Sequence, residues 1–121
     1  AQAVRRLLSV IPDGQILLAG NESIALGSLA LGVDGMISGL ATAVPEPLVG
    51  MINAFVAGDI LEARRQQQLV NRLLAVIPAG ARIGALKAIL EARGIPVGPP
   101  VPPLPEASLD IWANMVEILE A

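Results

Sequence analysis

The chain has 121 residues, a formal net charge of −3, and neither His nor Cys. These absences exclude Ser-His-Asp and Cys-His catalytic groups, ordinary structural zinc and iron–sulfur sites, and disulfides. No uncharged run exceeds 12 residues and the eight Lys and Arg form no basic stripe, which disfavours a membrane span and nucleic-acid binding.

The first third of the chain alternates between predicted helices and short apolar strands. Residues 3–11 are typical of an amphipathic helix, which a Pro-Asp-Gly turn ends. Residues 15–19 and 36–40 are apolar runs bounded by turn residues, as in buried strands, and residues 23–31 between them predict a helix. Glu22 precedes that helix, where the helix dipole favours a carboxylate, so we interpret it as a capping residue.

The rest of the chain predicts four helices and one proline-rich connection. The helices are expected from Pro45–Pro47 to Gly58, from Asp59 to about Ile77, over residues 82–93, and from Ser108 onward. Asp59 is the expected N-cap of the second of these, with Glu62 in the position of a capping box. In the same helix residues 64–68 are expected to be solvated, and Ile83 is expected on the inward face of the next helix. Residues 95–105 contain six prolines, which exclude a helix and a central strand.

The predicted strand–helix–strand unit does not form a closed domain by itself. A crossover of this kind joins parallel strands, and apolar parallel strands are normally covered on both faces. Two strands also leave unpaired edges that favour association. We therefore expect the last two β/α units of something larger, that is, a fragment or a chain that needs a partner. A (β/α)₈ barrel, for comparison, takes about 250 residues and carries its function at the carboxyl ends of the strands. In this chain those ends are residues 19–22 and 37–39.

Two segments at these strand ends carry a family resemblance, residues 17–22 (LLAGNE) and residues 32–41 (GVDGMISGLA). Weaker similarity comes from residues 45–46, 57–59, 86–88 and 99–104. Together they resemble the C-terminal part of the dihydrodipicolinate synthase / N-acetylneuraminate lyase family over nearly the whole chain. The resemblance implies an α/β fold: a C-terminal fragment of a (β/α)₈ TIM barrel, with its last two strands in residues 1–58 and a C-terminal helical extension in residues 59–121.

The implied chemistry is that of a lyase, a class I aldolase acting on pyruvate or another 2-oxo acid. In this family a lysine on strand six forms a Schiff base with the keto acid, so neither metal nor cofactor is expected. That lysine, a proton-relay tyrosine and a carboxylate-binding loop lie upstream of Ala1. The chain should therefore hold no catalytic residue and be inactive alone. The implied partners are the upstream half of the barrel and further copies in a homo-oligomer, a tetramer by family, in the cytoplasm.

The expected substrate-binding residues in this chain are Gly20, Asn21, Ile37 and Ser38. Gly20 and Ile37 match positions that line the family's keto-acid pocket, and Asn21 and Ser38 are adjacent to them. By residue type alone, Gly20 would be a turn glycine and Ile37 a core residue. The chain departs from the family pattern at Asn21, where Asp or Glu is frequent, at Thr42, where Asn is frequent, and at Val101, where Arg is frequent. These departures leave the second substrate open.

Several other residues have a functional and a structural interpretation. Lys87 is the only lysine, but it lies on a predicted helix face with Glu91 four residues later, so we interpret it as a solvated group and not a nucleophile. Glu22 and Glu46 could act as a carboxylate pair, although capping is favoured. The segment 95–105 could be a polyproline ligand, although a rigid connector is favoured. The alternative function is a non-catalytic structural or assembly module that associates through exposed strand edges and apolar helix faces.

Overall fold

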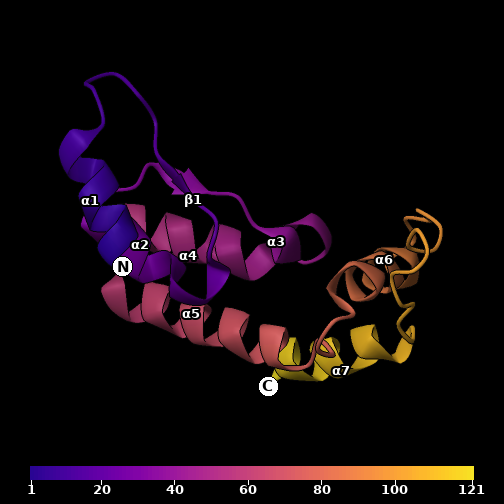
Figure 1. The fold of residues 1–121 in the computed structure, drawn as a ribbon. Helices are drawn as coiled ribbons and strands as arrows, with labels where there is room; N and C mark the ends of the chain where they lie inside the picture. The colour runs from indigo at the N-terminus through magenta and orange to yellow at the C-terminus, as the bar shows by residue number, and fades with distance from the viewer. The chain divides into compact units, whose positions relative to one another are not determined.

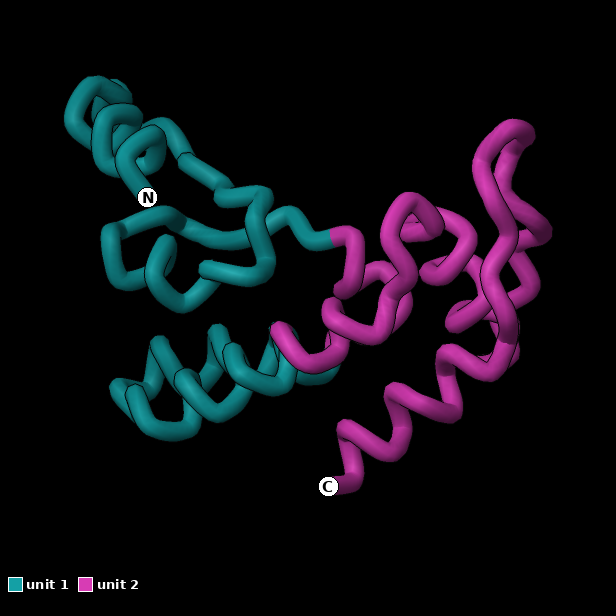
Figure 2. The backbone as a smooth tube through the Cα atoms, turned by 60° about the horizontal axis from the view of Figure 1, so that its bottom comes forward, with its two compact units in different colours: residues 1–38, 46–70 teal, residues 39–45, 71–121 magenta.

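The computed structural model describes all 121 residues, which form seven α-helices, one 3₁₀ helix and a two-stranded sheet (Figure 1). In chain order the elements are α1 (Gln2–Val10), β1 (Leu18–Ala19), η1 (Glu22–Ile24), α2 (Ala25–Leu31), β2 (Gly35–Met36), α3 (Gly39–Ala43), α4 (Glu46–Val56), α5 (Ile60–Ala75), α6 (Arg82–Ala92) and α7 (Asp110–Glu120). They divide into two compact units, residues 1–38 with 46–70 and residues 39–45 with 71–121 (Figure 2). No helix combines the length and the apolar character that crossing a membrane requires.

The sheet of the first unit is parallel, as the strand–helix–strand pattern predicts. Leu18 lies opposite Gly35, and Ala19 lies opposite Met36. The helices η1 and α2 connect the two strands, which confirms the predicted helix over residues 23–31 apart from its first turn. Because the strands are parallel, both carboxyl ends lie at the same edge of the sheet.

Both strands are shorter than the predicted runs 15–19 and 36–40. Before β1, Leu17 donates its N–H to the carboxylate of Asp34 at 2.8 Å, and Asp34 donates its own N–H back to the Leu17 carbonyl at 2.8 Å. The Leu17 N–H is therefore bonded to a side chain and not to a neighbouring strand, and β1 begins only at Leu18. The strand prediction for residues 39–40 is wrong, because the chain enters α3 at Gly39.

The N-cap predicted at Asp59 is confirmed, since its carboxylate accepts the N–H of Glu62 at 3.1 Å. The reciprocal half of the capping box is absent. The Glu62 carboxylate instead accepts two hydrogen bonds from the Arg65 guanidinium, at 2.7 and 2.8 Å, and one from Gln66 at 2.8 Å. The core of the first unit comes mainly from α2, α4 and α5, with Ala25, Leu29, Leu48, Met51, Ala54, Ala63, Leu69 and Val70 buried.

In the second unit α6 packs against α3 and α7. The predicted inward position of Ile83 is wrong, since 47% of its surface is exposed. The buried face consists largely of small residues, namely Gly84, Ala85, Leu86, Ala88 and Ile89. Small side chains let neighbouring backbone approach closely: a Cβ added at Gly84 would overlap the Pro105 carbonyl oxygen, and one at Gly39 would lie 3.2 Å from the Arg82 guanidinium.

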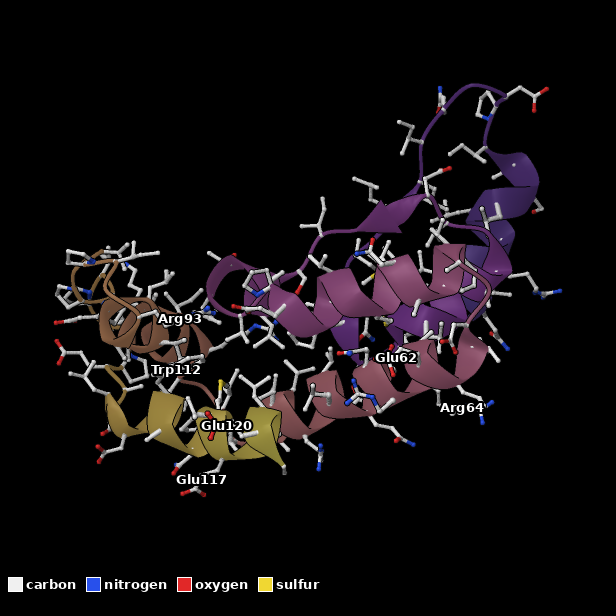
Figure 3. The ribbon with its side chains drawn as sticks, turned by 180° about the vertical axis from the view of Figure 1, so that it is seen from behind. Glu62, Arg64, Arg93, Trp112, Glu117 and Glu120 are labelled. Atoms are coloured by element: carbon white, nitrogen blue, oxygen red, sulfur yellow. The ribbon has the colours of Figure 1, made fainter.

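The proline-rich segment 95–105 forms no helix or strand, as predicted. It leads to α7, whose N-cap is Leu109, one residue after the predicted Ser108, although the Asp110 N–H donates to the Ser108 hydroxyl at 3.2 Å. Arg93 closes the unit: its guanidinium lies 4.8 Å from the ring centre of Trp112 and donates to the Ala43 carbonyl at 2.7 Å (Figure 3). One side chain thus joins the ends of α3, α6 and α7.

Candidate functional site

The four residues expected to bind substrate lie together at the carboxyl ends of β1 and β2. Gly20 and Asn21 directly follow β1, and Ile37 and Ser38 directly follow β2. The Ile37 N–H donates to the Ala19 carbonyl at 2.9 Å, so the ladder continues one residue past β2. Parallel pairing therefore gathers residues that are about one strand–helix unit apart in sequence.

Gly20 has no local structural reason to be glycine. Its backbone is not in the left-handed region, unlike six other glycines of the chain. A Cβ added there would meet nothing within 4 Å. Gly20 is therefore not needed for a turn that requires a positive φ.

Ile37 is not in the core of its unit, since 67% of its surface is exposed. Ile16 is 72% exposed and Leu18 is 47% exposed, so three large apolar side chains at the sheet lie open. The core interpretation of Ile37 is wrong for this chain. An apolar side chain left uncovered beside a strand end is available either to a ligand or to further strands.

The side chain of Asn21 is the cap of η1. Its Oδ1 accepts the backbone N–H of Ser23 at 3.1 Å and the Ser23 hydroxyl at 2.7 Å. Asparagine is a good capping residue because its short side chain reaches the backbone of the first turn. The cap expected at Glu22 is therefore at Asn21, and Glu22 lies inside the first turn.

Glu22 is buried, with only 4% of its surface exposed, and its carboxylate faces β2. The Ser38 hydroxyl donates to Glu22 Oε1 at 2.8 Å. A hydrogen bond to a charged acceptor is stronger than one between neutral groups. The two strand ends are thus joined by side chains as well as by backbone.

Gln67 of α5 also contacts this segment, although the sequence did not single it out. Its Nε2 donates to the Glu22 carbonyl at 2.9 Å, and its Oε1 accepts the Leu26 N–H at 2.8 Å. The expectation that residues 64–68 are solvated is wrong at this position. No local pattern could identify Gln67, because its partners lie more than 40 residues away in the chain.

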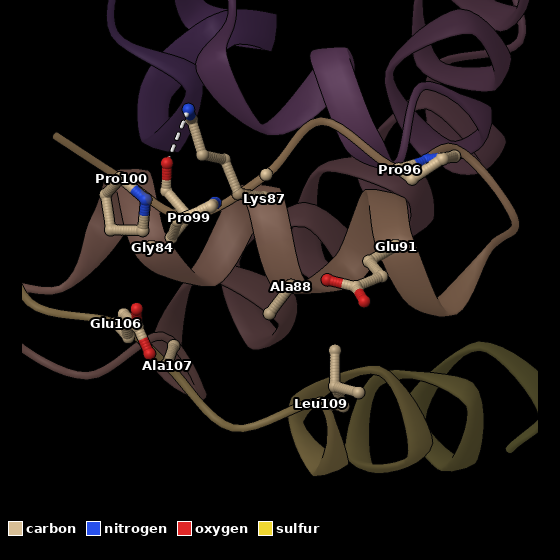
Figure 4. Close-up of a pocket in the computed structure, with 11 residues that line it drawn as sticks. Gly84, Lys87, Ala88, Glu91, Pro96, Pro99, Pro100, Glu106, Ala107 and Leu109 are labelled. Carbon is tan, nitrogen blue, oxygen red and sulfur yellow. Dashed lines mark hydrogen bonds between the residues drawn. The ribbon is translucent and has the colours of Figure 1, made fainter.

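Lys87 lies in the second unit and lines a cavity of about 480 Å³ between α6 and the proline-rich segment (Figure 4). Its Nζ donates to the Pro99 carbonyl at 3.2 Å. The pairing with Glu91 considered from the sequence is wrong, because no ion pair joins the two. The lysine therefore holds the connector on α6, as a rigid-connector interpretation of residues 95–105 requires.

The carboxylate of Glu62, in the first turn of α5, has a strongly shifted pKa. Hydrogen bonds from Arg65 and then from Gln66 lower the pKa of Glu62 from its ordinary 4.5 to about 2. The Arg65 guanidinium donates to both carboxylate oxygens of Glu62, which favours the charged form of the carboxylate. The chain contains no group of three or more acidic residues placed to hold a metal ion.

Comparison with known proteins gives a consistent set of relatives. The 4-hydroxy-tetrahydrodipicolinate synthase of Methanopyrus kandleri is 36% identical over 107 residues, which are 88% of this chain and 36% of that protein. The enzyme of the same name from an Exiguobacterium species is 34% identical over 118 residues, 95% of this chain and 39% of the relative. The chain therefore spans about 40% of the length of the curated relatives it matches.

Solved structures of similar fold include the same kinds of enzyme. Sialic acid aldolase of Ruminococcus gnavus matches with a TM-score of 0.86 at 23% identity, and dihydrodipicolinate synthase of Aquifex aeolicus with 0.79 at 23%. Each match covers 98% of this chain and 41% of the TIM-barrel structure. The model of the dihydrodipicolinate synthetase family matches residues 1–121. The chain thus belongs to the dihydrodipicolinate synthetase family of lyases.

Proposed function

We propose that this chain is the C-terminal part of a class I aldolase that acts on pyruvate or another 2-oxo acid. In this proposal β1 and β2 are the last two strands of the (β/α)₈ barrel, which residues 1–58 complete, and residues 59–121 form the helical extension. The observation that carries the proposal is the family match over the whole chain. Relatives named 4-hydroxy-tetrahydrodipicolinate synthase support the reaction class.

The proposed keto-acid site includes the carboxyl ends of β1 and β2. Function in TIM barrels is concentrated at this edge of the strands. Gly20 supports the proposal because nothing inside the chain requires a glycine there, so the open space beside it suits a ligand. Ile37 supports it because its exposed side chain offers an apolar wall next to the strand end.

The nucleophile of the reaction is proposed to lie upstream of this chain. A Schiff-base lysine needs a desolvated pocket or a cationic neighbour that keeps its amine neutral. Lys87 has neither: it is half-exposed, and its amine donates to the Pro99 carbonyl. Completion by the upstream half would supply the lysine, the tyrosine and the carboxylate-binding loop.

Trapping with borohydride and pyruvate tests the proposal, because borohydride reduces a protein imine to a stable amine. The barrel formed by this chain with its upstream half should be trapped. The 121-residue chain alone should not, and Lys87→Met in the complete barrel should trap as well as the wild type. No trapping in the complete barrel would refute the aldolase proposal. Trapping on the isolated chain would refute the upstream position of the lysine.

The exposed apolar side chains Ile16, Leu18 and Ile37 also favour the second candidate, a structural or assembly module. In the aldolase proposal the rest of the barrel covers them, and the complete protein assembles as a homo-oligomer, a tetramer, in the cytoplasm. Size-exclusion chromatography separates the two. A stable assembly of the isolated chain, together with no pyruvate trapping in any form, would favour the assembly module.

A further inference from the structure

We propose that Glu22 and Gln67 are positioning residues that hold the carboxyl end of β2 in place for keto-acid binding. The inference rests on the proposed function, because it takes Ile37 as a wall of the keto-acid site. Both residues are proposed to act on the keto-acid site indirectly, through hydrogen bonds to neighbouring residues. All of these residues lie in the first unit.

The first step is the weakness of the strand pairing itself. Each strand has only two residues, and the last backbone bond of the ladder is the one from the Ile37 N–H to the Ala19 carbonyl. Beyond Ile37 the backbone of β2 has no further strand bond to β1. Backbone pairing this short orders the end of β2 only weakly from the β1 side, so side-chain contacts beyond it add to that order.

The second step is the side-chain bond that follows where the ladder stops. Ser38 is the next residue along, and its hydroxyl donates to Glu22 Oε1 at 2.8 Å. Glu22 is 4% exposed, so water competes little for this bond. A buried carboxylate is costly unless it is hydrogen-bonded, so the pair resists separation. The bond therefore fixes the backbone directly after Ile37.

The third step fixes Glu22 in turn. Gln67 binds the segment 22–26 at both ends, donating to the Glu22 carbonyl at 2.9 Å and accepting the Leu26 N–H at 2.8 Å. The amide thereby satisfies the Leu26 N–H at the start of α2, where backbone N–H groups lack helical partners, and it is a second donor to the Glu22 carbonyl, which also accepts the Ala25 N–H. Helix α5 thus determines where the Glu22 carboxylate lies, and through it the position of Ser38.

Through Gln67, helix α5 therefore helps to position the residues of the proposed keto-acid site. The segment that carries Glu22 follows Gly20 and Asn21, and the segment that Glu22 holds follows Ile37. One clamp from α5 therefore orders both strand ends. A small displacement of such an edge weakens ligand binding more than it changes the chemical step, because the reacting lysine is proposed to lie elsewhere.

The test uses the complete barrel and matched variants on α5. Gln67→Leu should raise KM for pyruvate about fivefold to tenfold while kcat changes less than about twofold. Gln68→Leu, at the exposed neighbouring position, should leave both constants unchanged. Glu22→Leu should raise KM at least as much as Gln67→Leu. Glu22→Gln should largely restore it, because its amide oxygen can still accept from Ser38.

A merely structural role would lower the amount of active enzyme and leave KM unchanged, and that result would overturn the inference. A second measurement separates it from the proposed function. In the 121-residue chain, the Ile37 amide should exchange its hydrogen at least about tenfold faster in Gln67→Leu than in Gln68→Leu. If the wild-type barrel traps no pyruvate, the proposed function fails, and the exchange rate still decides whether Gln67 holds the end of β2. Equal exchange in the two variants would overturn the clamp.

Discussion

Gly84 offers the sharpest test of the packing in the second unit. It lies in the first turn of α6, against the chain that leads from the proline-rich segment to α7. In Gly84→Ala the new Cβ would overlap the Pro105 carbonyl oxygen and would lie 3.2 Å from the backbone of Glu106 and of Ala107. All three neighbouring atoms belong to the backbone. The overlap cannot be relieved by turning a side chain, so the segment 105–107 must move.

The size of the effect follows from two opposing contributions. Alanine in a helix is favoured over glycine by at most about 1 kcal/mol. Overpacking a close contact costs about 1–3 kcal/mol, and a backbone contact belongs at the upper end. We expect Gly84→Ala to lower the free energy of unfolding by about 2 kcal/mol. Gly27→Ala in α2 is the control, because its Cβ meets nothing within 4 Å, and it should raise that free energy by about 0.5–1 kcal/mol.

The assay is urea unfolding of the 121-residue chain, followed by circular dichroism. The midpoint should fall for Gly84→Ala and rise for Gly27→Ala, with the slope unchanged. Gly50→Ala should lie between them, because its Cβ would meet only the side-chain amide of Gln66, at 3.1 Å, which can move. A Gly84→Ala midpoint equal to the wild type would refute the close approach of the segment 105–107 to α6.

Three further predictions concern hydrogen bonds at helix ends. Asp59→Ala removes the cap of α5 and should lower the free energy of unfolding by about 1 kcal/mol in chemical denaturation. The pKa of Glu62 is depressed in the folded chain, so its bond with Arg65 stabilises fully above pH 4.5 and is lost as the pH falls toward 2; a pH series should show Glu62→Gln lacking this part of the decline. Arg93→Ala removes a charged hydrogen bond and a cation–π contact. It should cost about 2 kcal/mol and shift the fluorescence of Trp112, the only tryptophan.

Each of these has an outcome that contradicts it. Asp59→Ser keeps a capping oxygen and should recover most of the loss, whereas equal loss in both variants would argue against the cap. Parallel acid unfolding of the wild type and Glu62→Gln would show that the Arg65 bond does not persist in solution. Unchanged fluorescence and stability in Arg93→Ala would show that the contact with Trp112 is not populated.

The sequence was most informative where structure depends on a few neighbouring residues. The cap at Asp59 is predicted correctly because a capping side chain reaches backbone only a few residues away. The absence of helix and strand in residues 95–105 is equally predictable, since proline excludes a helix by its own geometry. Local covalent and steric rules decide these features without any tertiary contact.

Features that depend on distant partners were predicted poorly. The first strand is shorter than predicted because Ile16 and Leu17 continue the apolar run, although Leu17 donates its N–H to the Asp34 side chain and not to a strand. The predicted inward face of α6 is wrong at Ile83, because a periodic pattern favours burial of the large apolar side chains. The helix instead buries glycine and alanine where chain 105–107 crosses it closely, and Ile83 is left outside.

At the candidate site, too, local features are predictable and distant contacts are not. The sequence predicts that the four candidate residues lie together, because parallel pairing brings the carboxyl ends of two strands to one edge whatever the side chains are. The residues that hold that edge are not predicted. Glu22 at a helix start is typical of a dipole interaction, and Gln67 lies in a polar run typical of a solvated face. Their roles arise only when α5 lies against the start of α2.

The two glycines that follow the strands, Gly39 and Gly20, differ in what surrounds them. Gly39 has close neighbours in its own unit, because a Cβ there would lie 3.2 Å from the Arg82 guanidinium and in ordinary contact with Leu86 of α6. Gly20 faces open space and has an ordinary backbone conformation, so the folded chain would accept a side chain. A glycine loses more conformational entropy on folding than any other residue, so one without an internal reason is a net cost to stability. Nothing within the chain requires glycine at this position, and in the proposed aldolase either the rest of the barrel or a bound keto acid approaches the end of β1 there.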